Sequence, residues 1–200
     1  MNKFNKIVKV KDKHCLVNLI YPTAIQYLNG AIILDKYFQE NVMTEGTLDT
    51  YDASYLLRIL SLELFLKTIV VLTKGESIFG HSYKEIYEYL DADTRNLILA
   101  NLNSRSDVKY SNSQVKGYLA QYGKNFILIR YSYEDFVNND IDEYSDIVRR
   151  FMQSEPHDFT HAKIIYYSKE LDLLVESIKN LCDNLINDKL KKEAADTSHN

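Results

Sequence analysis

Three groups of polar side chains lie in otherwise apolar stretches of this sequence and are the candidates for chemistry. They are Glu63 with Lys67, His81, and Arg130 with Tyr133 and Glu134. Histidine is the side chain whose ordinary pKa lies nearest to neutral pH, so His81 is a candidate general acid or base. A structural alternative stays open. Glu63–Lys67 and Arg130–Glu134 have the i,i+4 spacing of helical ion pairs, and His81 would then be a capping or surface residue.

Other catalytic and ligand-binding motifs are missing from the sequence. It has no Gly-rich phosphate loop and no His-Glu-x-x-His, Cys-x-x-Cys or Gly-x-Ser-x-Gly motif. His157 and His161 have a spacing at which one helix could present both to a metal, but Pro156 and Asp158 place them at a helix start. We therefore expect solvated histidines there, and neither a metal nor a cofactor.

Residues 52–74, which carry Glu63 and Lys67, predict a central and mostly buried helix. Apolar residues occupy nearly every direction around this segment, so it lacks a clean solvent-facing side. A membrane span needs about 20 uninterrupted apolar residues, and Arg58, Glu63 and Lys67 interrupt this one. Asp52 or Ser54 could cap the helix at its start, and Gly75 could end it.

The flanking segments also predict helices. Residues 21–40 place Pro22 in a first turn, followed by an apolar stripe of Ile25, Leu28, Ile32, Ile33 and Phe38. Ser82 and Glu85 have capping-box spacing before a compact helix with Ile86, Tyr87 and Leu90 inward. Further helices are expected at 93–103 (Leu97, Ile98 and Leu102 inward), 113–123, 125–136 and 159–191, with loops at 41–51 and 104–113.

The composition favours one all-α domain, a bundle of about five main helices. Six glycines and two prolines among 200 residues are few for a protein of many short strands. We expect an N-terminal arm at 1–20, either a short strand or a frayed segment, the helical domain at 21–190 and a disordered tail at 191–200. Two cysteines and no signal-peptide pattern favour the cytoplasm, and the net charge of −4 gives no general attraction to nucleic acid.

The segments SLELFLKTIVVL, GHSYKEIYEYL and NFILIRYSYEDF together resemble the HEPN superfamily. The shared pattern is a Glu-x-x-x-Lys helix, a Gly-His that opens the next helix, and an Arg-Tyr-x-Tyr-Glu helix. The resemblance covers roughly residues 20–190. It implies a bundle of four to five helices, a homodimer, and a prokaryotic toxin–antitoxin or phage-defence role with RNA or an antitoxin as partner. The charges within 52–74 already exclude a membrane as partner. Active members cut RNA without metal, using an Arg and a His four to six residues apart and the 2′-hydroxyl as nucleophile.

The sequence departs from that active-site motif. No histidine follows Arg130 at the family spacing. Arg150 and His157 meet it, but a single match carries almost no evidence, since six arginines and five histidines give about 0.45 matches by chance, and Pro156 disfavours a helix joining them. Two hypotheses remain. In the first, Arg130 works with His81, or with Tyr133 in place of histidine, at a catalytic site that Glu63, Lys67 and Glu134 complete. In the second, the chain is a non-catalytic dimerisation or ligand-binding module.

Overall fold

The computed structural model describes residues 6–40, 47–130 and 164–197. Contacts between residues group the chain into two compact units, Met1–Gly123 with Tyr167–Asn200, and Lys124–Tyr166. The described residues form β1 (Ile7–Lys9), α1 (Lys13–Glu40), α2 (Thr47–Lys74), β2 (Glu76–Ile78), α3 (Tyr83–Tyr89), α4 (Ala92–Ser104), α5 (Asn112–Arg130) and α8 (Ser168–Thr197). The predicted all-α class is confirmed, since the only sheet among these residues is the short pair β1–β2.

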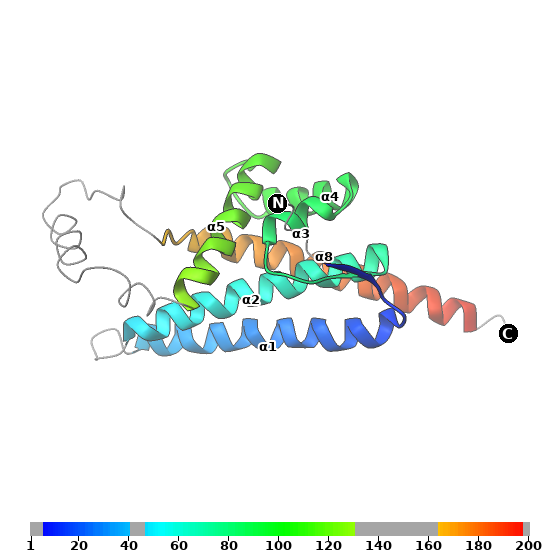
Figure 1. The fold of residues 1–200 in the computed structure, drawn as a ribbon, viewed down its shortest axis with the longest axis horizontal. Coiled ribbons are helices and arrows are strands. Elements are labelled where there is room, and N and C mark those ends of the chain that lie inside the picture. The colour runs from blue at the N-terminus through cyan, green and yellow to red at the C-terminus, as the bar shows by residue number, and fades with distance from the viewer. Residues whose placement is uncertain (1–5, 41–46, 131–163, 198–200) are drawn as a thin grey trace, which may run out of the picture. The chain divides into compact units, whose positions relative to one another are not determined.

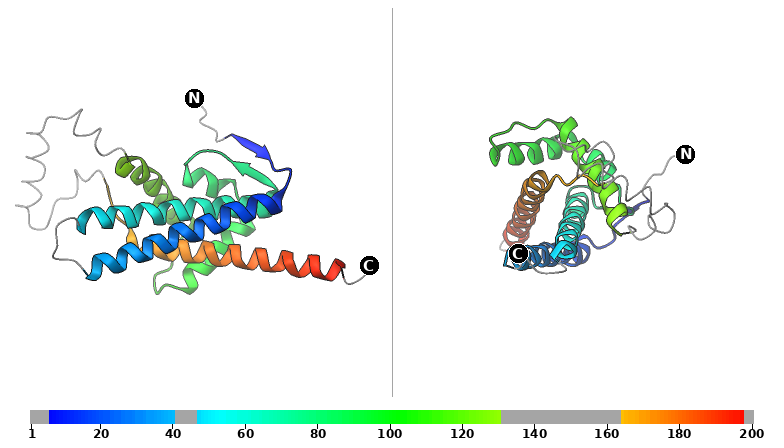
Figure 2. Two further views of the ribbon diagram at one scale, coloured as in Figure 1. Left: turned by 90° about the horizontal axis from the view of Figure 1, so that it is seen from below. Right: turned by 90° about the vertical axis from the view of Figure 1, so that its left-hand side faces the viewer.

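The larger unit is built on three long helices that lie side by side, α1, α2 and α8 (Figures 1 and 2). Helix α1 runs antiparallel to α2, and α8 runs in the same direction as α2. Both α1 and α8 pack on α2, α3 packs on α2, and α4 packs on α8. Helix α2 therefore contacts most of the unit.

Helix α2 is the central buried helix that its sequence predicts. Its fully buried side chains lie mostly on one wide face and include Ile59, Leu62, Phe65, Leu66, Ile69, Val70 and Val71. On the remaining side Leu57, Leu60 and Leu64 are half-buried. The helix begins at Thr47, earlier than expected, so Asp52 and Ser54 lie inside it and cap nothing. Among the residues that the structure describes, no helix is long and apolar enough to cross a membrane.

Helix α1 differs from its prediction in its start and in its buried face. It begins at Lys13, inside the predicted arm, because the Asp12 carboxylate accepts a hydrogen bond from the Cys15 N–H (2.9 Å) and caps it. Pro22 thus lies in the helix interior, on an exposed face. Proline has no N–H to donate to the carbonyl four residues earlier, and water can hydrogen-bond to that carbonyl instead.

The buried face of α1 combines the predicted Leu28 with Val17 and two alanines, and it leaves out the predicted Ile32 and Ile33. The buried residues are Val17, Ala24, Leu28 and Ala31, whereas Ile32 and Ile33 are 52% and 67% exposed. The predicted stripe was therefore wrong at Ile32 and Ile33. Alanine at a helix crossing lets two backbones approach closely, and this close approach leaves the bulkier isoleucines on the outer side.

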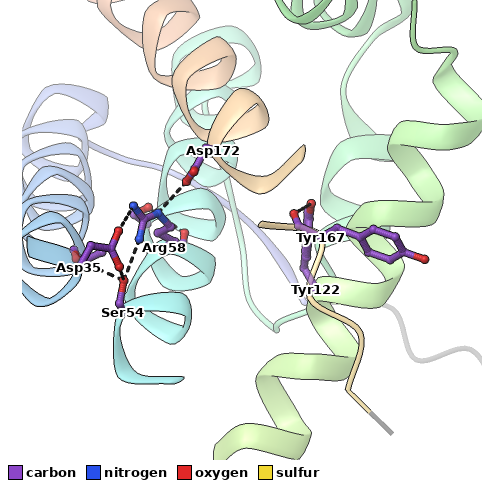
Figure 3. A network of polar contacts seen from close by, with 8 residues as sticks. Asp35, Ser54, Arg58, Tyr122, Tyr167 and Asp172 are labelled. Atoms are coloured by element: carbon purple, nitrogen blue, oxygen red, sulfur yellow. Dashed lines mark hydrogen bonds and ion pairs between the residues drawn. The ribbon is translucent and has the colours of Figure 1, made fainter. Parts of the chain in front are cut away.

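A single guanidinium joins the three long helices (Figure 3). Arg58 of α2 pairs through Nη2 with Asp35 of α1 and donates from Nε to Asp172 of α8 (2.7 Å). Its Nη1 donates to Ser54 Oγ (2.7 Å), which in turn donates to Asp35. Burial alone would lower the pKa of Arg58, but the hydrogen bonds and charges of Asp35 and Asp172 raise it above its ordinary value.

The segments that follow α2 begin and end at local signals, only some of which were expected. Gly75 ends α2 with a φ of +71°, as predicted. Ser82 precedes α3 but its side chain makes no capping hydrogen bond, so the capping-box prediction was wrong. The capping residue in this region is Asp91, whose carboxylate accepts from the Thr94 N–H (2.7 Å) at the start of α4. Leu97, expected inward, is exposed, while Ile98 and Leu102 are buried.

The predicted helices at 113–123 and 125–136 are, up to Arg130, one continuous helix, α5. Gly123, at the end of the first predicted helix, lies within α5 and allows close packing: a Cβ there would lie 3.2 Å from Cδ2 of Tyr83. Helix α8 begins at Ser168, later than the predicted residue 159, and extends to Thr197, into the segment predicted as a tail.

Two glycines of α5 give a matched test of this packing. A Cβ added at Gly117 would meet no atom within 4 Å, so Gly117→Ala should raise the free energy of unfolding by about 0.5–1 kcal/mol through helix propensity. Gly123→Ala should lose this gain, because its methyl group meets the buried Tyr83 ring. Urea unfolding measures both; equal stabilisation by the two substitutions would contradict the packing argument.

The Arg58 contacts predict that substitutions of Arg58, Asp35 and Asp172 lower the free energy of unfolding by unequal amounts. Arg58→Met should lower the free energy of unfolding by about 2–3 kcal/mol, since it leaves two carboxylates without their cation. Asp172 is 55% exposed and Asp35 only 28%, so Asp172→Asn should cost less than about 1 kcal/mol and Asp35→Asn more. The exposed Arg105→Met is the control for loss of an arginine, and equal effects of the two aspartate substitutions would refute the ranking.

Candidate functional site

Glu63 lies at the centre of a polar cluster that α2 and the segment before α3 build together. Its carboxylate is only 4% exposed, yet it contacts two nitrogen groups. Lys67 Nζ donates to Oε1 (2.6 Å), as the spacing on one helix predicts. His81 Nδ1 lies 2.9 Å from Oε2 and 3.1 Å from Oε1. One buried anion thus binds both a lysine and a histidine.

Strand β2 and the turn at Gly80 position His81 beside Glu63. β2 follows Gly75 and pairs antiparallel with β1, with Ile7 opposite Ile78 and Lys9 opposite Glu76. The pairing continues past the strand, because the Phe79 N–H donates to the Lys6 carbonyl (3.0 Å). Gly80 then adopts a φ of +115°, a conformation that side-chain-bearing residues rarely adopt, and turns the chain into His81.

Tyr83 closes the buried side of the cluster. Its ring is fully buried, and burial together with the nearby charge of Glu63 raises its pKa well above the ordinary value for tyrosine. Tyr83 therefore stays neutral at any physiological pH. The ring is held in place by α5, where Gly123 lies against it.

The remaining predicted site residues cannot be joined to this cluster from the described structure. Arg130 is the last described residue of α5, and its side chain lies outside the described part. Tyr133, Glu134, Arg150, His157 and His161 also lie outside it. Of the six candidates, the structure brings together Glu63, Lys67 and His81.

The contact with Glu63 decides which nitrogen of His81 can act as a base. A carboxylate only accepts hydrogen bonds, so Nδ1 carries the proton that faces it. In the neutral ring the lone pair then resides on Nε2. The imidazole is 55% exposed, and it is therefore a ring whose orientation is fixed from the buried side and whose outer part reaches solvent.

Sequence reasoning missed the second polar cluster, formed by Arg58, Asp35 and Asp172. Arg58 counted only as a charge that excludes a membrane span. A buried arginine in an apolar helix is itself a signal, because such a cation requires carboxylate partners. No signal in the sequence identifies the partners, which come from helices on either side of α2.

No group of His, Cys, Asp and Glu side chains in the described ranges could hold a metal ion. Searches against protein-family models, curated proteins and solved structures found no match to this chain.

Replacing Glu63 should disturb both stability and the histidine. Glu63→Gln keeps the shape but leaves Lys67, only 14% exposed, without its counter-charge, so the free energy of unfolding should fall by about 1–3 kcal/mol. The His81 proton should also shift from Nδ1 toward Nε2, which imidazole nitrogen chemical shifts report. Glu176→Gln, an exposed site on α8, is the control; a variant of Glu63 with wild-type stability and an unchanged tautomer would show that the contact is not formed.

Proposed function

We propose that this chain is a HEPN-like protein of a prokaryotic toxin–antitoxin or phage-defence system that cleaves RNA without a metal ion. One observation carries the proposal: a half-exposed histidine held through Nδ1 by a buried carboxylate. That arrangement gives a base of fixed orientation, which metal-independent RNA cleavage requires. In the same proposal the protein is cytoplasmic, forms a homodimer and binds an antitoxin.

In this proposal His81 Nε2 accepts the proton of an RNA 2′-hydroxyl. The 2′-oxygen attacks phosphorus, the bond from phosphorus to the 5′-oxygen breaks, and the leaving 5′-oxygen takes a proton from water. His81 then returns its proton to the hydroxide that this water leaves. The products are a 2′,3′-cyclic phosphate and a free 5′-hydroxyl. Glu63 acts as a positioning residue for the imidazole, and Lys67 compensates the Glu63 charge.

Arg130 has the second role in this proposal, the stabilisation of negative charge on the phosphate. A guanidinium suits that role because it is always charged and donates several hydrogen bonds in one plane. Tyr133 and Glu134 follow it in the sequence, and Glu134 has the spacing of a helical partner for Arg130.

A second candidate function is a non-catalytic dimerisation or ligand-binding module. It is favoured by the missing histidine after Arg130 and by the contacts that Lys67 and His81 already make with Glu63. In that case the cluster only stabilises the fold.

RNA cleavage in the presence of EDTA separates the two functions. The wild type should convert labelled single-stranded RNA to fragments with 2′,3′-cyclic phosphate ends. His81→Ala should reduce the rate by about 10²–10⁴-fold, the usual contribution of a general base, and Arg130→Ala should lower both cleavage and growth inhibition in a bacterial host.

Exposed residues of the same types serve as controls. His14→Ala on α1 and Arg105→Ala beside α4 should cleave at the wild-type rate. If the wild type leaves RNA intact, or if His81→Ala and Arg130→Ala cleave normally, the nuclease proposal is wrong and the binding module is favoured.

A further inference from the structure

A shallow hollow on the larger unit has no role in the proposed chemistry. It has a volume of about 280 Å³ and is lined by Gln114, Gly117, Tyr118 and Gln121 of α5 and by Tyr167, which precedes α8. Gly117 forms an open part of its wall, since a Cβ there would meet no atom within 4 Å. The hollow therefore has room for one small planar group.

Aromatic rings form one side of the hollow. Tyr118 and Tyr167 are edge to face, with ring centroids 5.1 Å apart, and Tyr110 packs on Tyr118 in the same manner at 6.1 Å. Edge-to-face packing holds the rings rigidly and leaves ring faces for a further planar partner to stack on. The Tyr122 hydroxyl fixes Tyr167 further by donating to its carbonyl (3.1 Å; Figure 3).

Gln114 supplies an oriented hydrogen-bond donor at the rim. Its Oε1 accepts from both the backbone N–H and the hydroxyl of Ser111, each at 2.9 Å. These two bonds fix the amide with its nitrogen end directed away from Ser111, and no described residue accepts from that nitrogen. A ligand with a ring nitrogen or a carbonyl at its edge satisfies this donor, whereas a hydrocarbon ring does not.

Charge around the hollow disfavours an anionic ring. Burial, and then the carboxylate of Glu170, raise the pKa of Tyr118 above its ordinary value. The same negative charge would repel an aromatic carboxylate. A neutral heteroaromatic ring with polar edges meets all of these conditions.

We infer that the hollow binds a nucleobase, which stacks on the tyrosine rings and accepts a hydrogen bond from Gln114. The inference rests on the proposed function for its source, a base of single-stranded RNA, because stacking on aromatic side chains is how proteins commonly hold unpaired bases. A free nucleoside presents the same chemistry, and the experiment distinguishes the two.

The experiment is an NMR titration with adenosine and, separately, with a single-stranded RNA of about eight nucleotides. The RNA is added to the His81→Ala variant so that it stays intact. Saturable shifts are expected at the Gly117 amide, the Gln114 side-chain amide and the rings of Tyr118 and Tyr167. Gly117→Leu fills the hollow while it improves helix propensity, and should weaken binding by about tenfold or more.

Ala100→Leu, an exposed site on α4, is the control for added apolar surface and should bind like the parent protein. Binding of the RNA, whether or not adenosine also binds, supports a base of single-stranded RNA as the ligand of the hollow. Binding of adenosine alone supports base binding in the hollow but shows that the base does not come from RNA. The absence of saturable shifts with both probes, or equal binding by Gly117→Leu, overturns it. His81 does not line the hollow, so base binding that persists without any cleavage would refute the nuclease proposal alone.

Discussion

The contact of Arg58 with two carboxylates is the constraint on which the arrangement of the long helices depends. The guanidinium is largely buried, and its desolvation is offset only where Asp35 of α1 and Asp172 of α8 both reach it. Apolar packing alone allows helices to slide against each other with little change in buried area. A buried cation with two fixed partners prevents such sliding, so Arg58 sets the register of α1 and α8 against α2. Helix α2 in turn carries Glu63.

The two polar clusters of α2 satisfy buried charges in opposite ways. At Arg58 one cation lies between two anions, whereas at Glu63 one anion lies between a lysine and a histidine. The first cluster has a net negative charge and the second is neutral, or positive when His81 is protonated. The negative net charge therefore disfavours an anion at the first cluster more than at the second.

The sequence contains enough information for the central helix and for half of the cluster on it. Apolar residues all around 52–74 require burial on every side, and the spacing of Glu63 and Lys67 requires that they meet. The hypothesis of a shared site grouped His81 with them, but residue spacing alone could not place it there, because its position depends on the pairing of β1 with β2 and on the turn at Gly80. On α1 the prediction was correct at Leu28 but wrong at Ile32 and Ile33, because the close crossing selects Ala24 and Ala31. The division of α5 into two predicted helices at 123–125 was wrong, because Gly123 lies within the helix, where it permits close packing on Tyr83.

The path of the chain through the bundle has a consequence for how the protein is made. Helices α1 and α2 adjoin in sequence, but the partner of Arg58 on α8 lies 114 residues away, and Cys182, which donates to the Phe65 carbonyl, lies 117 residues away. At the usual rate of translation, α2 therefore waits on the order of ten seconds for the helix that covers it. During that time the newly made α1–α2 hairpin lacks the helix that covers the α8-facing side of α2 in the finished fold. Completion of α8 buries that side.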